Sequence, residues 1–164
     1  MKFTIRHAVE APPARAVAAY ASPGFYEGRP ARDNIAVHGV VLHEVHSDRV
    51  VLEVRFAFTG HVSGAVRALV DPDKLSWVTR TEVWPADARS TWEVRPDHYP
   101  DRLHARGTYR FEPGEAGSSG TLVLVDGELT VRVPIVGRTV ERTIVSGLRE
   151  YLEDEVTSIA DFDG

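Results

Sequence analysis

The stretch TLVLVDGELTVRV at residues 121–133, with Pro134 and then IVGRTVERTIVSGLREYLEDEVTSIAD at residues 135–161, decides the fold. Its first part alternates in polarity and predicts a strand over Thr121–Val133. Its second part repeats apolar residues at helical spacing and predicts one amphipathic helix over Ile135–Asp161. The apolar stripe of this helix comprises Val136, Val140, Ile144, Leu148, Tyr151, Leu152, Ile159 and Phe162. A β-rich chain must bury such a stripe against its sheet, an arrangement that commonly encloses a ligand cavity.

The chain before this stretch is rich in predicted strands. An alternating strand, Lys2–Glu10, precedes a short helix, Ala14–Tyr20, and another helical turn is expected at Phe25–Arg29. The long connection Gly60–Lys74 is expected to act as a lid, with a short helix over Ser63–Val70. Five more strands are predicted at Ile35–Val45, Val50–Thr59, Leu75–Trp84, Ser90–Val94 and Leu103–Phe111.

The order of these elements predicts an α+β fold in a single domain, residues 1–164. Hairpin connections favour an antiparallel sheet. We expect a curved sheet of six or seven strands wrapped around the long C-terminal helix, with short helices after the first strand.

Composition narrows the function classes. The chain has 164 residues, a formal net charge of -5 and no cysteine. The negative charge disfavours nucleic acid as a partner, and the lack of cysteine excludes disulfides, thiolate zinc sites and cysteine nucleophiles. The sequence shows no apolar run of the signal-peptide kind and no stretch of about 18 apolar residues. We therefore expect a cytoplasmic protein without an integral membrane segment.

Two motifs resemble a known family. Arg80-Thr81-Glu82-Val83-Trp84 lies in a predicted middle strand, and Val131-Arg132-Val133-Pro134-Ile135-Val136-Gly137, running into Val140-Glu141, joins the last strand to the last helix. Through them nearly the whole chain resembles DUF2505, an actinobacterial family of proteins of unknown function in the START-like (SRPBCC, Bet v 1-like) superfamily. The resemblance implies the helix-grip fold and a deep hydrophobic cavity for an apolar or amphipathic ligand. It implies no known reaction.

Three residues have alternative roles in such a cavity. Thr143 and Gly147 fall on the apolar face of the helix, where Gly147 serves either close packing of a strand or space for a ligand. His7 shares a phase with Phe3 and Ile5, so it is either a hydrogen-bonded core histidine or a cavity-lining residue. The histidines lack metal-binding spacing, and we expect neither a metal site nor a cofactor.

Strand phases predict which side chains face the helix. Glu10, Glu53, Glu93 and Glu112 fall in the outward phase, so we expect few acids inside, which disfavours a two-carboxylate mechanism. The tryptophans serve either the packed core or an apolar ligand wall. The residues predicted to line the ligand site are His7, Val54, Phe56, Trp77, Thr79, Trp92, Tyr109, Ile144, Gly147 and Leu148.

Three functions fit these patterns. The leading interpretation is non-catalytic binding or transport of an apolar or amphipathic small molecule, lipid-like or polyketide-like. The enzymatic alternative is a polyketide cyclase or dehydratase, as some START-like proteins are, with His7 as the candidate acid–base group. The third is a scaffold or interaction module with a closed core, which predicts an exposed apolar patch. A homodimer is also compatible with the sequence.

Overall fold

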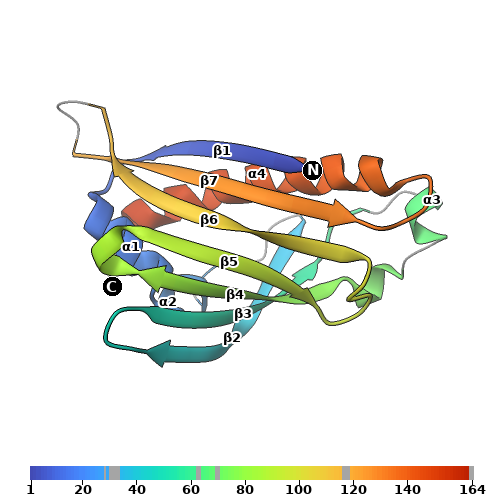
Figure 1. The fold of residues 1–164 in the computed structure, drawn as a ribbon, viewed down its shortest axis with the longest axis horizontal. Coiled ribbons are helices and arrows are strands. Elements are labelled where there is room, and N and C mark those ends of the chain that lie inside the picture. The colour runs from blue at the N-terminus through green and yellow to red at the C-terminus, as the bar shows by residue number, and fades with distance from the viewer. Residues whose placement is uncertain (28, 30–33, 62–63, 69–70, 116–118, 163–164) are drawn as a thin grey trace.

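The architecture is one curved antiparallel sheet with a long helix along one face. A computed structural model describes residues 1–27, 29, 34–61, 64–68, 71–115 and 119–162. Within these ranges seven strands pair in the order β1-β7-β6-β5-β4-β3-β2 (Figure 1). The strands are β1 (Lys2–Val9), β2 (Ile35–Val45), β3 (Val50–Phe58), β4 (Ser76–Trp84), β5 (Arg89–Pro96), β6 (Leu103–Pro113) and β7 (Thr121–Val131). This confirms the predicted helix-grip fold.

Helices lie between some of the strands and after the last strand. Two follow β1, a short one precedes β4, and the longest ends the chain (Figure 1). Because β1 pairs with β7, the first and last strands together form the part of the sheet on which the last helix packs. The helices are α1 (Pro13–Tyr20), α2 (Pro23–Glu27), α3 (Gly64–Arg67) and α4 (Gly137–Asp161), with single 3-10 turns at Pro72–Lys74 and Pro85–Asp87.

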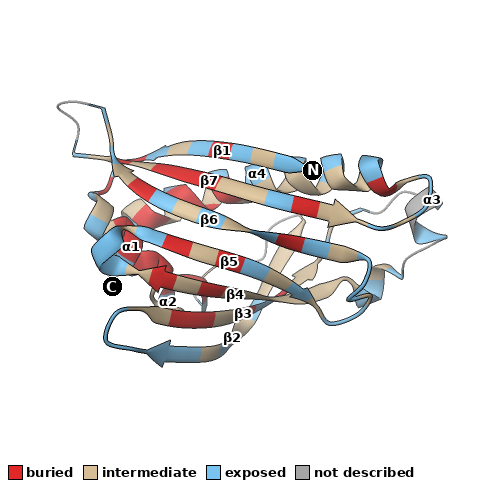
Figure 2. Cartoon of the chain, in the orientation of Figure 1, coloured by how far each residue is buried: buried red, intermediate tan, exposed pale blue. Residues whose placement is uncertain are grey.

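The main core lies between α4 and the β1–β7 side of the sheet. Leu152 and Ile159 of α4 are fully buried in one cluster with Ile5 of β1 and Val125 of β7. Burying each such side chain stabilises the fold by roughly 1.5–3 kcal/mol. The buried residues of α4, apart from Gly137, all lie in its C-terminal half (Figure 2). The N-terminal half of the helix therefore packs less tightly on the sheet.

The last helix begins two residues later than predicted. Ile135 has a φ of 69°, a left-handed conformation that excludes it from an α-helix and that a β-branched residue rarely adopts. Val136 is the N-cap, and β7 ends at Val131 instead of Val133. The segment 132–136 is thus a true connection between strand and helix.

Other bounds differ by a few residues. β5 extends to Pro96 and β6 to Pro113, because pairing with neighbouring strands continues beyond the alternating part of each sequence. The predicted helix Ser63–Val70 is shorter, since α3 spans Gly64–Arg67, and residues 62, 63, 69 and 70 lie outside the described residues. The lid role of residues 60–74 stays a prediction. No helix in the described ranges is long and apolar enough to cross a membrane.

Candidate functional site

The register of the sheet places all the strand residues predicted to line the ligand site on the face that α4 covers. Directly opposed residues share a face, as do alternate residues along a strand. This relation links Val54 to Thr79 and Phe56 to Trp77 across β3 and β4. The residues on this face are His7 of β1, Val54 and Phe56 of β3, Trp77 and Thr79 of β4, Trp92 of β5 and Tyr109 of β6. Contact with a ligand at these positions stays a prediction.

An aromatic group connects β3 and β4 to the helix. The rings of Phe56 and Trp77 stack with centroids 5.8 Å apart. The Phe56 ring also meets the Tyr151 ring of α4 edge-on at 6.2 Å. Since Phe56 is buried whereas Trp77 and Tyr151 are half-buried, the group forms an apolar wall that solvent still reaches in part.

Beside this wall lies a buried polar cluster formed by Tyr20, Arg29, Tyr151 and Glu155. The Arg29 Nη1 donates to Glu155 Oε1 at 2.7 Å and to the Tyr151 hydroxyl at 3.0 Å. The Tyr20 hydroxyl donates to Glu155 Oε2 at 3.0 Å. The side chains of Arg29 and Glu155 are only 8% and 3% exposed. Both oxygens of this buried carboxylate therefore accept a hydrogen bond.

Charge and burial set the protonation of this cluster. Burial raises the pKa of Tyr20, and the Glu155 carboxylate raises it further. Burial opposes the charge on Arg29, but Glu155 more than offsets this, so the Arg29 pKa is raised. The Arg29 guanidinium also lies over the Phe25 and Tyr151 rings, 5.2 and 4.8 Å from their centroids. The cluster holds a permanent cation and neutral phenols around one carboxylate.

Glu155 is the one buried carboxylate among the described residues, so the interior has few acids, as expected. It lies four residues after Tyr151 and four before Ile159, and this spacing puts it on the apolar stripe of α4. Helical phase could therefore have identified Glu155. Arg29 lies outside regular secondary structure, and no periodicity pointed to it.

Two tyrosines of the inner face stay within reach of solvent. Tyr109 and Tyr151 lie deep enough for desolvation to raise the pKa of each phenol. Both side chains nevertheless stay partly accessible to solvent, whereas Tyr20 is 1% exposed. Part of each phenol is therefore still available to contact another molecule.

The helix contributes both packing and a gap to this region. Ile144 packs on a second core cluster with Trp92, and Leu148 packs on the main core. A Cβ added at Gly147 would meet no atom of the described structure within 4 Å, so the close-packing interpretation of this glycine is wrong. Thr143 was expected on the apolar face, but it is exposed and donates to the Thr139 carbonyl.

Glu141 lies near the start of α4. Its carboxylate is half-buried and accepts a hydrogen bond from the Val131 backbone N–H at 3.0 Å. It thereby attaches the first turns of α4 to the end of β7. Trp92, in contrast, belongs to a packed cluster with Ala105 and Leu129, so packing accounts for most of its surface.

His7 points toward α4 from β1, and it has no hydrogen bond at Nε2 within the described structure although that atom is buried. Burial lowers its pKa below the ordinary value of 6.5, with Arg149 acting in the same direction and Glu153 and Glu155 opposing. A hydrogen-bonded core histidine was one of the two predicted roles, and Nε2 does not have the hydrogen bond that this role requires. His7 therefore binds a proton less readily than an unperturbed histidine.

We expect His7 to make the fold acid-sensitive. With its folded pKa lowered, the unfolded chain binds the proton more tightly, so the free energy of unfolding falls as pH drops below about 6.5 and levels off below the folded pKa. Urea denaturation of wild type and His7→Gln at about pH 7.5 and about pH 5.5 tests this, because both pH values bracket the ordinary pKa. The wild type should lose more stability than the variant on acidification. Equal losses would show that His7 does not titrate differently on folding.

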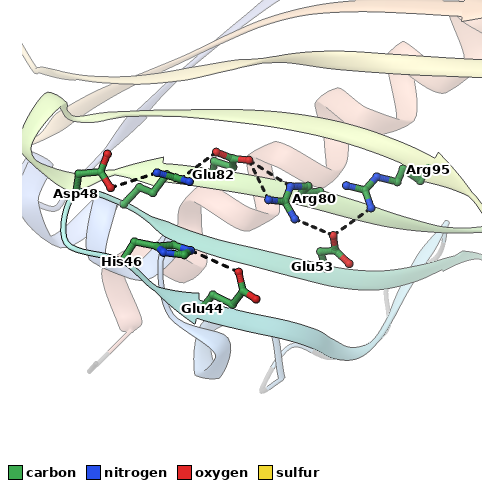
Figure 3. A network of polar contacts seen from close by, with 8 residues as sticks. Glu44, His46, Asp48, Glu53, Arg80, Glu82 and Arg95 are labelled. Carbon is green, nitrogen blue, oxygen red and sulfur yellow. Dashed lines mark hydrogen bonds and ion pairs between the residues drawn. The ribbon is translucent and has the colours of Figure 1, made fainter.

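The opposite face of the sheet carries a network of exposed and half-buried ion pairs. Arg80 contacts Glu53 and Glu82, each at 3.1 Å, and Arg95 also contacts Glu53 at 3.1 Å (Figure 3). A shallow groove of about 570 Å³ crosses this face, lined by Lys2, Arg80, Glu82, Thr91, Trp92, Glu93, Arg106, Gly107, Thr108, Asp126, Gly127 and Glu128. Its lining has three cations and four carboxylates, and Arg80 and Arg106 already pair with Glu82 and Glu128, so the inner face is the better candidate site.

Sequence comparison assigns the chain to a family. The family model described as "Protein of unknown function (DUF2505)" matches residues 4–162. The chain belongs to the DUF2505 family. A search of curated proteins finds no significant sequence match.

Solved structures share the fold of this DUF2505 protein. The Zhui aromatase/cyclase from Streptomyces sp. R1128 superposes with a TM-score of 0.68 at 14% identity, covering 98% of this chain and 93% of that one. TTHA0849 from Thermus thermophilus gives 0.65 at 15% identity, covering 98% and 95%. A START superfamily protein from Mycobacterium smegmatis gives 0.56 at 16% identity, covering 94% and 96%. These likenesses establish the START-like fold.

Proposed function

We propose that this DUF2505 protein binds an apolar or amphipathic small molecule between the sheet and α4 and catalyses no reaction on it. The observation that carries the proposal is the partial exposure of Tyr109 and Tyr151, two side chains of the inner face that solvent still reaches. Ligand sites are mostly apolar with a few placed polar groups, and these two phenols provide such groups in an aromatic setting.

The shape of the interior supports the same proposal. Only the β1–β7 side of the sheet is tightly packed by α4, and the inner residues Trp77, Thr79 and Val94 of β4 and β5 stay half-buried. The gap at Gly147 lies one helical turn before Tyr151, on the same side of α4. An apolar molecule placed there would cover half-exposed aromatic surface, which favours binding by roughly 25 cal/mol per Å².

The polar cluster suggests the character of the ligand. Arg29 and Glu155 neutralise each other, so within the described cluster of Tyr20, Arg29, Tyr151 and Glu155 no buried charge is left unpaired to attract an ion. A neutral molecule with an apolar body and a hydroxyl or carbonyl group fits this setting best. A lipid-like or polyketide-like compound has these properties.

We expect filling the Gly147 gap to displace the ligand. In Gly147→Phe the ring would occupy space that is empty in the protein, and a steric cost of about 1–3 kcal/mol weakens binding by roughly 5- to 150-fold. Native mass spectrometry of purified protein, followed by solvent extraction, measures the bound compound. Gly147→Ala is the matched control and should retain it.

Two results would contradict the proposal. Undiminished ligand in the folded Gly147→Phe variant would place the ligand elsewhere. Absence of any extracted compound, together with failure of the purified protein to bind the apolar dye 8-anilinonaphthalene-1-sulfonate, would exclude an accessible apolar site.

A further inference from the structure

The connection between β7 and α4 projects an apolar residue into solvent. Ile135 is 103% exposed, so its side chain contacts essentially nothing else in the protein. Its φ of 69° is an unfavourable conformation for a β-branched residue. Strained backbone of this kind often marks a functional site, because the surrounding structure has to maintain it. Neither packing nor backbone preference accounts for isoleucine at this position.

Exposed arginines flank this tip in the sequence. Arg132, Arg138 and Arg142 are all exposed, and among the described residues none of them makes an ion pair. Arginines elsewhere on the surface, such as Arg55 and Arg110, pair with carboxylates. Residues 130–149 contain four arginines and one carboxylate, and that carboxylate, Glu141, is turned toward the backbone of β7.

We infer that this tip docks on an anionic lipid surface, with Ile135 inserted at the interface and the three arginines against the lipid headgroups. A protruding apolar residue flanked by unpaired cations is complementary to a negatively charged membrane surface. A fluid lipid surface needs no preformed pocket to receive an isolated side chain, whereas a protein partner does. The net charge of -5 restricts the attraction to this end of the molecule.

The position of the tip gives docking a defined orientation. In Figure 1 the β7–α4 connection and α3 lie at the same end of the molecule, opposite the C-terminus. The backbone N–H of Arg132 donates to the Arg102 carbonyl at 2.8 Å, so the loop between β5 and β6 lies at this end too. Membrane docking here and ligand binding beneath α4 are separate properties, and either can hold without the other.

Co-sedimentation with vesicles tests the docking of the purified protein. We expect binding to vesicles of phosphatidylcholine mixed with phosphatidylserine, little binding to phosphatidylcholine alone, and weakening as salt concentration rises. Ile135→Asn should lower the affinity roughly tenfold, because the inserted apolar surface is lost. The triple variant Arg132→Gln, Arg138→Gln and Arg142→Gln should lower it roughly a hundredfold, at roughly fivefold for each arginine.

Two matched controls and one opposite effect make the test specific. Val45→Asn removes an apolar residue that is 72% exposed on β2, and Arg106→Gln removes a cation paired with Glu128 on the outer face. Both should bind vesicles like wild type. Ile135→Asn should also raise the midpoint of thermal unfolding, because asparagine tolerates positive φ better than isoleucine does. Reduced binding therefore cannot be ascribed to unfolding.

Three results would overturn the inference. Wild-type protein that fails to bind phosphatidylserine vesicles would exclude an anionic lipid surface. Wild-type affinity in the Ile135→Asn variant would exclude insertion of this residue. Retention on polyglutamate-coated beads that depends on Ile135, without vesicle binding, would identify an acidic protein as the partner instead.

Discussion

Replacing Glu155 by leucine is expected to lower the free energy of unfolding by about 3–5 kcal/mol. The substitution leaves the guanidinium of Arg29, which is only 8% exposed, without its carboxylate, and it removes the acceptor of the Tyr20 hydroxyl. A buried charge without a partner costs far more free energy than the intact pair contributes. Its apolar surroundings supply neither the hydration that the charge has in water nor the opposite charge that it has lost. Urea denaturation followed by circular dichroism measures the loss.

A double variant separates the charge from the packing. Arg29→Met combined with Glu155→Leu should recover most of the stability, since neither buried charge then lacks a partner. Glu153→Gln, at an exposed position two residues earlier in the same helix, should change the free energy of unfolding by about 0.5 kcal/mol or less. A loss below about 1 kcal/mol in Glu155→Leu would show that water reaches the pair.

A second large loss of stability is expected when Gly107 in β6 is replaced by alanine. A Cβ there would run into the backbone oxygen of Asp126 on β7 and lie 2.6 Å from Cζ2 of Trp92. Backbone atoms of a central strand cannot move away cheaply, so Gly107→Ala should cost about 3 kcal/mol, the upper end of the usual overpacking penalty. The midpoint of urea unfolding should fall at an unchanged denaturant dependence.

A glycine-to-alanine substitution in α4 should have the opposite effect on stability. Gly147→Ala adds a methyl group in open space and improves helix propensity, which should raise the free energy of unfolding by about 1 kcal/mol. A stabilising Gly107→Ala would mean that β6 and β7 are farther apart than described. A destabilising Gly147→Ala would mean that a strand packs against this glycine after all.

Alternation predicted the strands and their faces well because the signal is local. A residue such as Phe56 or Tyr109 faces the helix for the same reason as its neighbours two positions away, and pairing with the next strand preserves that phase. The start of α4 was wrong by two residues, because the conformation of Ile135 depends on how the chain leaves the sheet.

The polar cluster could be predicted only in part. The spacing of Glu155 from Tyr151 and Ile159 places it on the apolar stripe, which by itself makes a buried carboxylate deducible. Its partner Arg29 is 126 residues away and lies outside regular secondary structure. No local pattern carries information about a pairing of that kind.

The sequence by itself determined the order of elements, the face of each strand and membership of the DUF2505 family, because these follow from periodicity and short motifs within the chain. Tertiary structure alone decided that Arg29 neutralises Glu155, that Gly147 borders open space and that Ile135 projects into solvent. These features depend on the distance at which separate elements pack and on the backbone angles that packing imposes. Between the strand ending at Val131 and the helix starting at Gly137, the same stretch that predicts the fold presents a fully exposed isoleucine.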